Sequence, residues 1–185
     1  MTGIQEVKRE KYGLSRLFLL TMLLSYFGWL FETGYFLIAK GKYSDRGFLT
    51  LPFCPIYGCS LVFLYLLLGT PDRGKGRSFL RGFLYLLLCF LLPSVMELFI
   101  GVLFDRTWNC RLWSYSNEPY NIGGYICLRN SIVWGIGSFL FMNYLFSPIK
   151  KAVGKIPRRW SDRIAFVLFA FVLLDFIYNL IGFYR

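Results

Sequence analysis

Apolar residues fall into long runs along the chain, not into short alternating patterns. Four runs, residues 14–38, 79–104, 131–146 and 164–184, are long enough or nearly so to cross a hydrocarbon core as a helix, which takes about 20 residues. A fifth run, residues 56–68, is short, because a helix rises only about 1.5 Å per residue. We predict an all-α, polytopic membrane bundle with about five transmembrane helices.

The short run follows a segment with two prolines, residues 51–55. Proline lacks the amide hydrogen and clashes one turn back, so a helix does not readily extend through it. Two alternatives follow. Either the segment enters the bilayer as irregular backbone shielded by protein, giving a span over residues 53–68, or the helix is short and buried.

The composition supports a membrane protein. Hydrophobic residues make up 56% of the 185 residues and charged residues only 17%, whereas a soluble domain carries about 25%. We therefore interpret residues 1–185 as a single integral membrane domain. The first run carries Glu32 and lacks a small-residue cleavage pattern, so we expect a true span and not a signal peptide.

Charge and histidine content exclude several function classes. The net charge of +11 is distributed between the apolar runs, which argues against nucleic-acid binding. The sequence contains no histidine, so the usual general base and the commonest metal ligand are absent. We expect neither an enzyme nor a cofactor or metal protein.

The distribution of Lys and Arg predicts the topology. With five spans and a cytoplasmic N-terminus, fourteen basic residues lie on the inner side and seven on the outer side. The positive-inside rule favours this orientation, in a multi-pass protein of the cell membrane. The basic run at residues 150–159 would then anchor the topology and contact anionic lipid, or alternatively dock a cytosolic partner.

Three carboxylates, Glu32, Glu97 and Asp175, lie in the first, third and fifth predicted spans. These spans run in the same direction, which puts the acids at about 9–15 Å below the outer surface. A carboxylate at membrane depth costs at least about 2.5–3.5 kcal/mol and therefore needs a partner or a wet cavity. We predict that the three acids meet in the interior of the bundle.

Small and polar residues at helical spacing predict which faces line that interior. They are Ser25, Gly28 and Tyr35 in the first span, Pro93 and Gly101 in the third, Ser131, Gly135 and Ser138 in the fourth, and Tyr178, Asn179 and Gly182 in the fifth.

Two interpretations of the acids remain open. In the first they are paired structurally with outer arginines, Arg46, Arg111 and Arg129, since buried ion pairs serve specificity more than stability. In the second the same groups form a substrate or ion site together with Tyr57 and Asn121. The helix start near residues 52–58 adds free amides, which favour an anionic group.

The predicted loop between the third and fourth spans is rich in aromatic residues. We expect it to lie on the outer membrane surface, where such rings are favoured, with a lid over the acids as the alternative. Its aromatic residues include Trp108, Trp113, Tyr115, Tyr120 and Tyr125.

Two blocks of sequence resemble a known family, the putative ABC-transporter type IV (CmpB-like) membrane proteins. The first block comprises residues 28–32, 41–49 and 52–58, and the second comprises residues 111–116, 119–122, 124–128, 131 and 134–135. The resemblance covers roughly residues 20–160 and implies a transporter-related membrane protein. The family pattern has an acid and an arginine where this chain has Ser114 and Tyr125, so a charge pair between those positions would be missing as a whole.

Two motifs suggest chemistry that the rest of the chain does not support. Residues 69–76 match a phosphate-binding loop except at the last position, the magnesium ligand, and no strand precedes them. We interpret them as a connector, so any ATP-driven role needs a separate subunit. The five cysteines lack metal-ligand spacing; free thiols are favoured, with a Cys110–Cys127 disulfide as the alternative.

These observations predict a transporter- or permease-like subunit with a polar site in the outer half of the bundle. The expected partners are the lipid bilayer, a separate ATPase or other membrane subunit, and a second copy of the chain. The alternatives are a non-transporting accessory, signalling or envelope protein whose carboxylates are structural, and a membrane enzyme that uses two carboxylates as acid and base.

Overall fold

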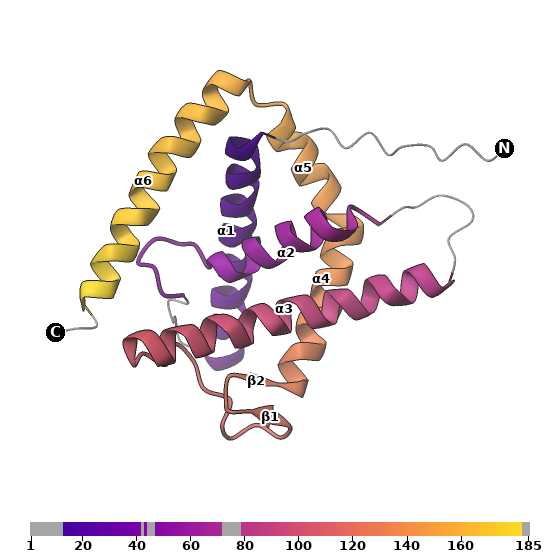
Figure 1. The fold of residues 1–185 in the computed structure, drawn as a ribbon, viewed down its shortest axis with the longest axis vertical. Helices are drawn as coiled ribbons and strands as arrows, with labels where there is room; N and C mark the ends of the chain where they lie inside the picture. Colours follow the sequence, from indigo (N-terminus) through magenta and orange to yellow (C-terminus); the bar gives the residue numbers. More distant parts are fainter. Residues whose placement is uncertain (1–12, 42, 44–46, 72–78, 183–185) are drawn as a thin grey trace.

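The computed structural model describes residues 13–41, 43, 47–71 and 79–182. Within them the chain forms six helices and one two-stranded sheet (Figure 1). The elements are α1 Leu14–Lys40, α2 Pro55–Leu68, α3 Phe79–Trp108, β1 Asn121–Ile122, β2 Ile126–Cys127, α4 Leu128–Tyr144, α5 Phe146–Gly154 and α6 Arg158–Gly182. The all-α prediction is confirmed, because the two strands have only two residues each.

Helix α1 matches the first predicted span and has a defined end. Gly41 adopts a left-handed conformation with φ of 62°, and its amide donates a hydrogen bond to the carbonyl of Leu37. A side chain with a Cβ is disfavoured in this conformation, so glycine is suited to end the helix there.

The segment 47–54 returns from the end of α1 without helix or strand. The ring of Phe48 packs against rings of both α3 and α6, at centroid distances of 5.1 and 5.2 Å. The amide of Cys54 donates to the carbonyl of Ser25 at 3.1 Å. Helix α2 follows, has 14 residues and begins with Pro55. The structure therefore shows an irregular backbone that contacts α1, α3 and α6, followed by a short helix. That this segment enters the bilayer stays a prediction.

The fourth predicted span, residues 131–146, is a bent pair of helices. Helices α4 and α5 meet at 52°, and the bend falls at Leu145, just before Pro148 in the first turn of α5. Proline supplies no amide for a helical hydrogen bond, which favours a break at this point.

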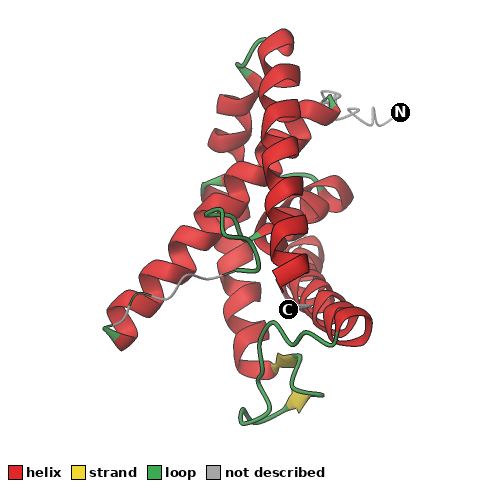
Figure 2. Ribbon diagram, turned by 90° about the vertical axis from the view of Figure 1, so that its left-hand side faces the viewer, coloured by secondary structure: helices red, strands yellow, loops and turns green. Residues whose placement is uncertain are grey.

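The long connection between α3 and α4 carries a small hairpin, which the sequence did not predict. Its strands pair antiparallel, with Asn121 opposite Cys127. Gly123 and Gly124 turn between them with φ of 59° and 74°, a region that glycine enters without strain. Figure 2 shows the hairpin and its loop gathered at one end of the molecule, below the helices.

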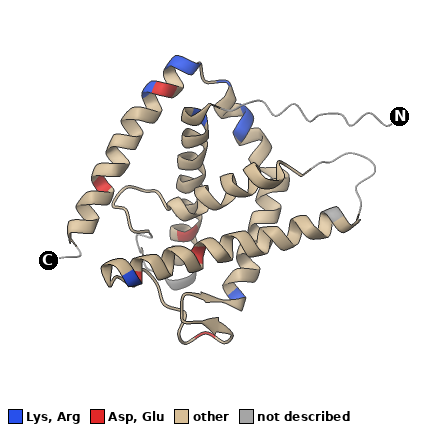
Figure 3. Ribbon diagram, viewed as in Figure 1, with Lys and Arg blue, Asp and Glu red and all other residues tan. Residues whose placement is uncertain are grey.

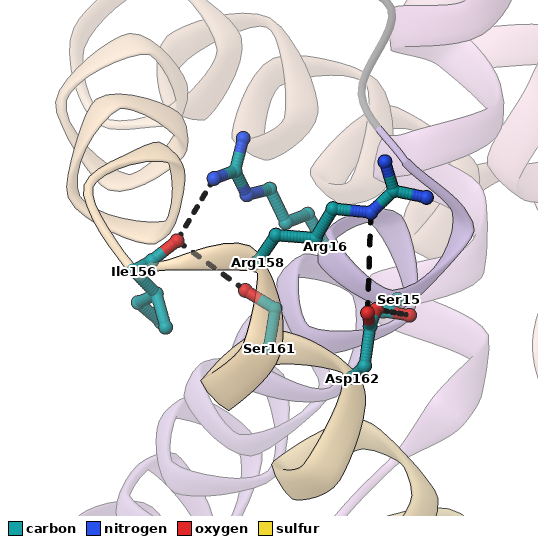
Figure 4. Close-up of polar contacts among 6 residues, drawn as sticks. All are labelled: Ser15, Arg16, Ile156, Arg158, Ser161 and Asp162. Carbon is teal, nitrogen blue, oxygen red and sulfur yellow. Dashed lines mark hydrogen bonds and ion pairs between the residues drawn. The ribbon is translucent and has the colours of Figure 1, made fainter.

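The opposite end ties the start of α1 to the turn between α5 and α6 (Figure 4). The hydroxyl of Ser15 donates to Asp162 at 2.6 Å, and the guanidinium of Arg16 donates to the carbonyl of Ile156 at 2.9 Å. Arg158 lies 4.0 Å from the same aspartate. Figure 3 shows Lys and Arg at this end on α1, α5 and the start of α6, and others at the end of α3 and the start of α4.

Small residues allow the helices of the bundle to approach closely. A Cβ at Gly58 of α2 would overlap the carbonyl oxygen of Thr21 and the side chain of Ser25 on α1. A Cβ at Gly135 of α4 would lie 3.0 Å from Phe90 of α3. The predicted small-residue faces therefore face the interior at Ser25 and Gly135, whereas Tyr35 and Tyr178 are 54% and 73% exposed and do not.

Three helices are long and apolar enough to cross a membrane, within Leu14–Ile38, Gly82–Trp108 and Arg158–Gly182. The bent α4–α5 pair raises the number to four among the described residues, and α2 is a shorter apolar helix. The all-α, apolar helices fit the predicted membrane protein, but Figure 1 shows α3 lying across α1 and not parallel to it, contrary to the expectation that the first and third spans run in the same direction. The count of five and the cytoplasmic N-terminus stay predictions. Helix α6 begins at Arg158, six residues before its predicted span at 164.

Candidate functional site

Two of the three predicted carboxylates lie together. Glu32 comes from the second half of α1 and Glu97 from the middle of α3, and their charges interact. Glu97 is 5% exposed, whereas Glu32 is half-buried. We call this pair, with the tyrosines that bind it, the carboxylate site.

Each carboxylate accepts a hydrogen bond from a tyrosine of a different element. Tyr57, in the first turn of α2, donates to Oε2 of Glu32 at 2.7 Å. Tyr115, in the loop between α3 and α4, donates to Oε1 of Glu97 at 2.8 Å. Hydrogen bonds to an ionised acceptor are among the stronger ones in proteins. The first bond connects α2 with α1, and the second connects the loop with α3.

Aromatic packing encloses the carboxylate site. The ring of Tyr57 lies 4.5 Å from that of Trp134 on α4, and a Cβ at Gly28 would overlap the same tyrosine ring. The side chain of Trp134 lies near enough to the carboxylate of Glu97 to interact with it, and the side chain of Asn130 interacts in the same way with the hydroxyl of Tyr115. Helix α4 thus forms one wall of the site.

Burial and the neighbouring acid determine the protonation of Tyr115. Burial raises the pKa of its hydroxyl, and the charge of Glu97 and the hydrogen bond to it raise this pKa further. Tyr115 therefore keeps its proton throughout the physiological pH range and remains a donor to Glu97.

One oxygen of Glu97 differs from the rest of the site. Oε2 is buried and makes no hydrogen bond to any described residue. None of the described contacts of Glu97 is with a Lys or Arg. Buried polar atoms in proteins nearly always have a hydrogen-bond partner, so a buried oxygen without one is a candidate to bind a proton, an ion or a water molecule.

Asp175 does not join this pair among the described contacts, contrary to the prediction that three acids meet. Its Oδ2 accepts the amide of Leu51 at 3.0 Å and its Oδ1 accepts the side chain of Asn179 at 3.1 Å. Asn179 in turn bonds to Thr50. Asp175 therefore holds the irregular segment 47–54 against α6.

The outer arginines have partners other than the three acids. Arg111 donates to the carbonyl of Gly123 and lies 4.9 Å above the ring of Tyr125. Arg129 pairs with Glu118 at 3.6 Å. Arg46 lies outside the described residues. The interpretation that Arg111 and Arg129 neutralise the buried acids is therefore wrong for the described contacts.

Asn121 organises the hairpin loop and does not reach the acids in the described contacts. Its side-chain amide donates to the carbonyl of Glu118 at 2.8 Å, and its Oδ1 accepts the amide of Gly124 at 3.0 Å. The loop is closed further by the indole of Trp113, which donates to the carbonyl of Tyr125 at 2.7 Å. The loop presents Tyr115 as part of an ordered unit.

Sequence reasoning missed Tyr115 and Trp134 as members of the site. Both lie in the motif blocks that resemble the family, and Tyr115 also belongs to the aromatic-rich loop. The lid alternative for that loop agrees with the contact between Tyr115 and Glu97. Those two signals together, an aromatic loop with a motif, could have pointed to the contact.

All five cysteines are free thiols, including Cys110 and Cys127, which agrees with the favoured alternative. Burial raises the pKa of the Cys110 thiol, and the nearby Asp105 raises it further.

We predict slow alkylation of Cys110 by iodoacetamide at neutral pH, because the thiolate is the nucleophile and its fraction is small below a raised pKa. The rate should climb as the pH rises toward that pKa. Asp105→Asn should speed the reaction only modestly, since burial is the larger cause. Peptide mapping by mass spectrometry measures Cys110 separately, and a rate equal to that of an unstructured cysteine peptide would contradict the prediction.

Comparison with known proteins adds one finding to this geometry. The family model described as "Putative ABC-transporter type IV" matches residues 19–180, which include α2–α5 and most of α1 and α6. No curated protein and no solved structure matches the chain.

Proposed function

Because the chain belongs to the putative ABC-transporter type IV family, we propose that it is a transporter- or permease-like membrane subunit whose carboxylate site binds what it transports or couples to. The apolar helices and the family fit a membrane protein. The finer proposal, a polar site that binds and does not catalyse, rests on the geometry of Glu32 and Glu97.

The observation that carries the proposal is the meeting of two acids from separate helices inside an apolar bundle. Acids at membrane depth are costly and mark ion pathways, proton relays or substrate sites more often than scaffolding. Glu97 is buried and Glu32 is half-buried, so the pair extends from the protein interior toward its surface. A site with one buried and one partly exposed acid is suited to exchange a bound ion or substrate with its surroundings.

The proposal puts the basic end of the molecule in the cytoplasm of a multi-pass cell-membrane protein. Lys and Arg on α1, α5 and the start of α6 lie there (Figure 3), and the positive-inside rule favours such an excess on the cytoplasmic side. Glu32 lies beyond the middle of α1 counted from that end, which is the outer half in this orientation.

Partners are part of the proposal. A subunit with so few helices offers a small permeation path, so we propose that it works with a second membrane subunit, a separate ATPase, or another copy of itself. The phosphate-loop-like sequence at residues 69–76 lies partly outside the described residues, and we assign it no nucleotide.

A second candidate function is a non-transporting accessory whose acids hold the bundle together. The observation that favours it is that each carboxylate already accepts a tyrosine hydrogen bond from its own chain. Asp175 shows that an acid of this protein can serve purely to anchor a segment.

The two functions predict different results for Glu32→Gln. We expect this variant to reach wild-type amounts in the membrane but to lose at least about ten-fold in solute flux, equivalent to roughly 1.4 kcal/mol at the site. The assay measures uptake of a panel of labelled cations and anions into vesicles that carry the protein and any co-purified subunit.

Glu118→Gln is the matched control, because Glu118 pairs with Arg129 on the loop surface and does not contact Glu32 or Glu97 in the described residues. It should keep wild-type flux. Absence of flux for every solute in the wild-type protein, or loss of the Glu32→Gln protein itself, would favour the accessory function.

A further inference from the structure

We propose that Glu97 binds an exchangeable proton on Oε2 and that Tyr115 closes this proton site from the loop between α3 and α4. The proposal deepens the proposed function and rests on it for the purpose of the proton, but the protonation itself can be measured without any transport.

The first argument is the environment of Glu97. It is 5% exposed and its Oε1 is bonded to Tyr115, while Oε2 has no hydrogen-bond partner among the described residues. A buried carboxylate that keeps its charge needs a cation or several donors, and otherwise the neutral acid is the stable form. Because no described Lys or Arg pairs with Glu97, a proton on Oε2 is the simplest neutralisation.

The second argument is the set of groups that face Glu97 from the packed elements. Glu32 on α1 is a like charge, which opposes a second negative charge nearby. None of the other described groups around the two acids is a Lys or Arg. These groups are Tyr57 and Cys54 at the start of α2, Tyr115 in the loop, and Asn130 and Trp134 on α4.

The third argument is space. The ring of Tyr57 fills the position where a Cβ would stand at Gly28 and lies 4.5 Å from Trp134. The described residues contain no group of three or more His, Cys, Asp or Glu that could hold a metal ion. A proton needs neither volume nor a ligand shell, so it suits a site this closely packed.

Tyr115 is suited to gate the proton. Its raised pKa keeps its own proton in place, so it donates to Oε1 whether Glu97 is neutral or ionised. Tyr115 is tied to the loop, because its amide donates to the carbonyl of Gly124 at 2.8 Å, so any displacement of the loop carries Tyr115 with it. If the loop withdraws, the space that the tyrosine leaves admits water to the carboxyl group, including the buried Oε2 that carries the proton. The O–H bond of the acid then breaks, the proton passes to water, and the electron pair stays on the carboxylate.

The test is infrared spectroscopy of the purified full-length protein in phosphatidylcholine vesicles as the pH is varied. We expect a carbonyl band of a protonated carboxylic acid that shifts in heavy water and disappears as the pH rises. Glu97→Gln should remove this band, whereas the control Glu118→Gln should keep it. Tyr115→Phe should keep the band but speed its hydrogen–deuterium exchange by about ten-fold, the equivalent of one lost hydrogen bond.

Four outcomes would overturn the proposal. The wild-type protein shows no protonated carboxyl band at any pH, the band survives Glu97→Gln, or the exchange rate is unchanged in Tyr115→Phe. A band that sodium, potassium or tetramethylammonium removes at constant pH would also overturn it, since the site would then take that cation. An intact band in a protein that transports no solute would contradict the proposed function alone.

Discussion

Gly58→Leu is expected to leave little folded protein in the membrane. A Cβ at this position would overlap the carbonyl oxygen of Thr21 and the hydroxyl of Ser25, and it would lie 3.0 Å from the amide of Ser25. Most of these atoms belong to the backbone of α1, which cannot move aside without separating the two helices. Overpacking typically costs about 1–3 kcal/mol, and the upper part of this range is expected here because backbone atoms oppose the new side chain.

The consequences of this change reach the carboxylate site. Helix α2 carries Tyr57 directly beside Gly58, so a shift of α2 away from α1 also breaks the hydrogen bond from Tyr57 to Glu32. Lipid-embedded helices associate through close packing, and a bulky residue at the contact removes that attraction. We expect loss of the monodisperse peak in detergent size-exclusion chromatography.

The matched control is Gly137→Leu. Gly137 is also a helical glycine, but a Cβ there meets no atom within 4 Å, and leucine has the better helix propensity. It should yield as much folded protein as the wild type. Equal yield and melting temperature for Gly58→Leu and Gly137→Leu would contradict the close approach of α1 and α2.

Asp175→Ala is expected to lower the free energy of unfolding by about 1–3 kcal/mol, the cost of leaving a partly buried donor without its acceptor. The amide of Leu51 donates to Asp175, and Asn179 bonds to both Asp175 and Thr50. Removing the carboxylate releases the segment 47–54 from α6. Differential scanning fluorimetry in detergent and limited proteolysis of that segment measure the two effects.

Asp175→Asn provides the comparison for this prediction. Asparagine keeps an oxygen that can accept the amide of Leu51, so most of the stability should return. A variant equal to Asp175→Ala would show that the charge matters and not the acceptor. Unchanged melting and proteolysis in Asp175→Ala would contradict the anchoring role.

Much of the fold was predictable from local sequence. The apolar runs predicted α1, α3 and α6 because the length of a helix that crosses a bilayer follows directly from the thickness of the hydrocarbon core. Prolines 52 and 55 predicted the irregular segment and the late start of α2, since the missing amide and the ring act on the neighbouring turn alone.

The candidate site was predictable only in part. Glu32 and Glu97 come together as the helical faces implied, and Tyr57, predicted as a member of the same site, bonds to Glu32. Asp175 shares their helical spacing and predicted depth but bonds to Leu51 and Asn179. Depth in a membrane does not specify how a helix is rotated about its own axis, and this rotation decides which neighbour a side chain faces. Tyr115 lies 18 residues after Glu97 and reaches it from the loop that follows α3, a contact that no helical periodicity encodes.

The sequence by itself determined that this protein has apolar membrane-length helices, which segments break them, and which acids are buried at a cost. These properties depend on the solvation and backbone geometry of short stretches. Only the tertiary structure decided which acid lies beside which, that Arg111 and Arg129 serve the loop, and that Oε2 of Glu97 has no described partner. Such pairings depend on the rotation and close approach of whole helices, which are fixed by packing between residues distant in the chain.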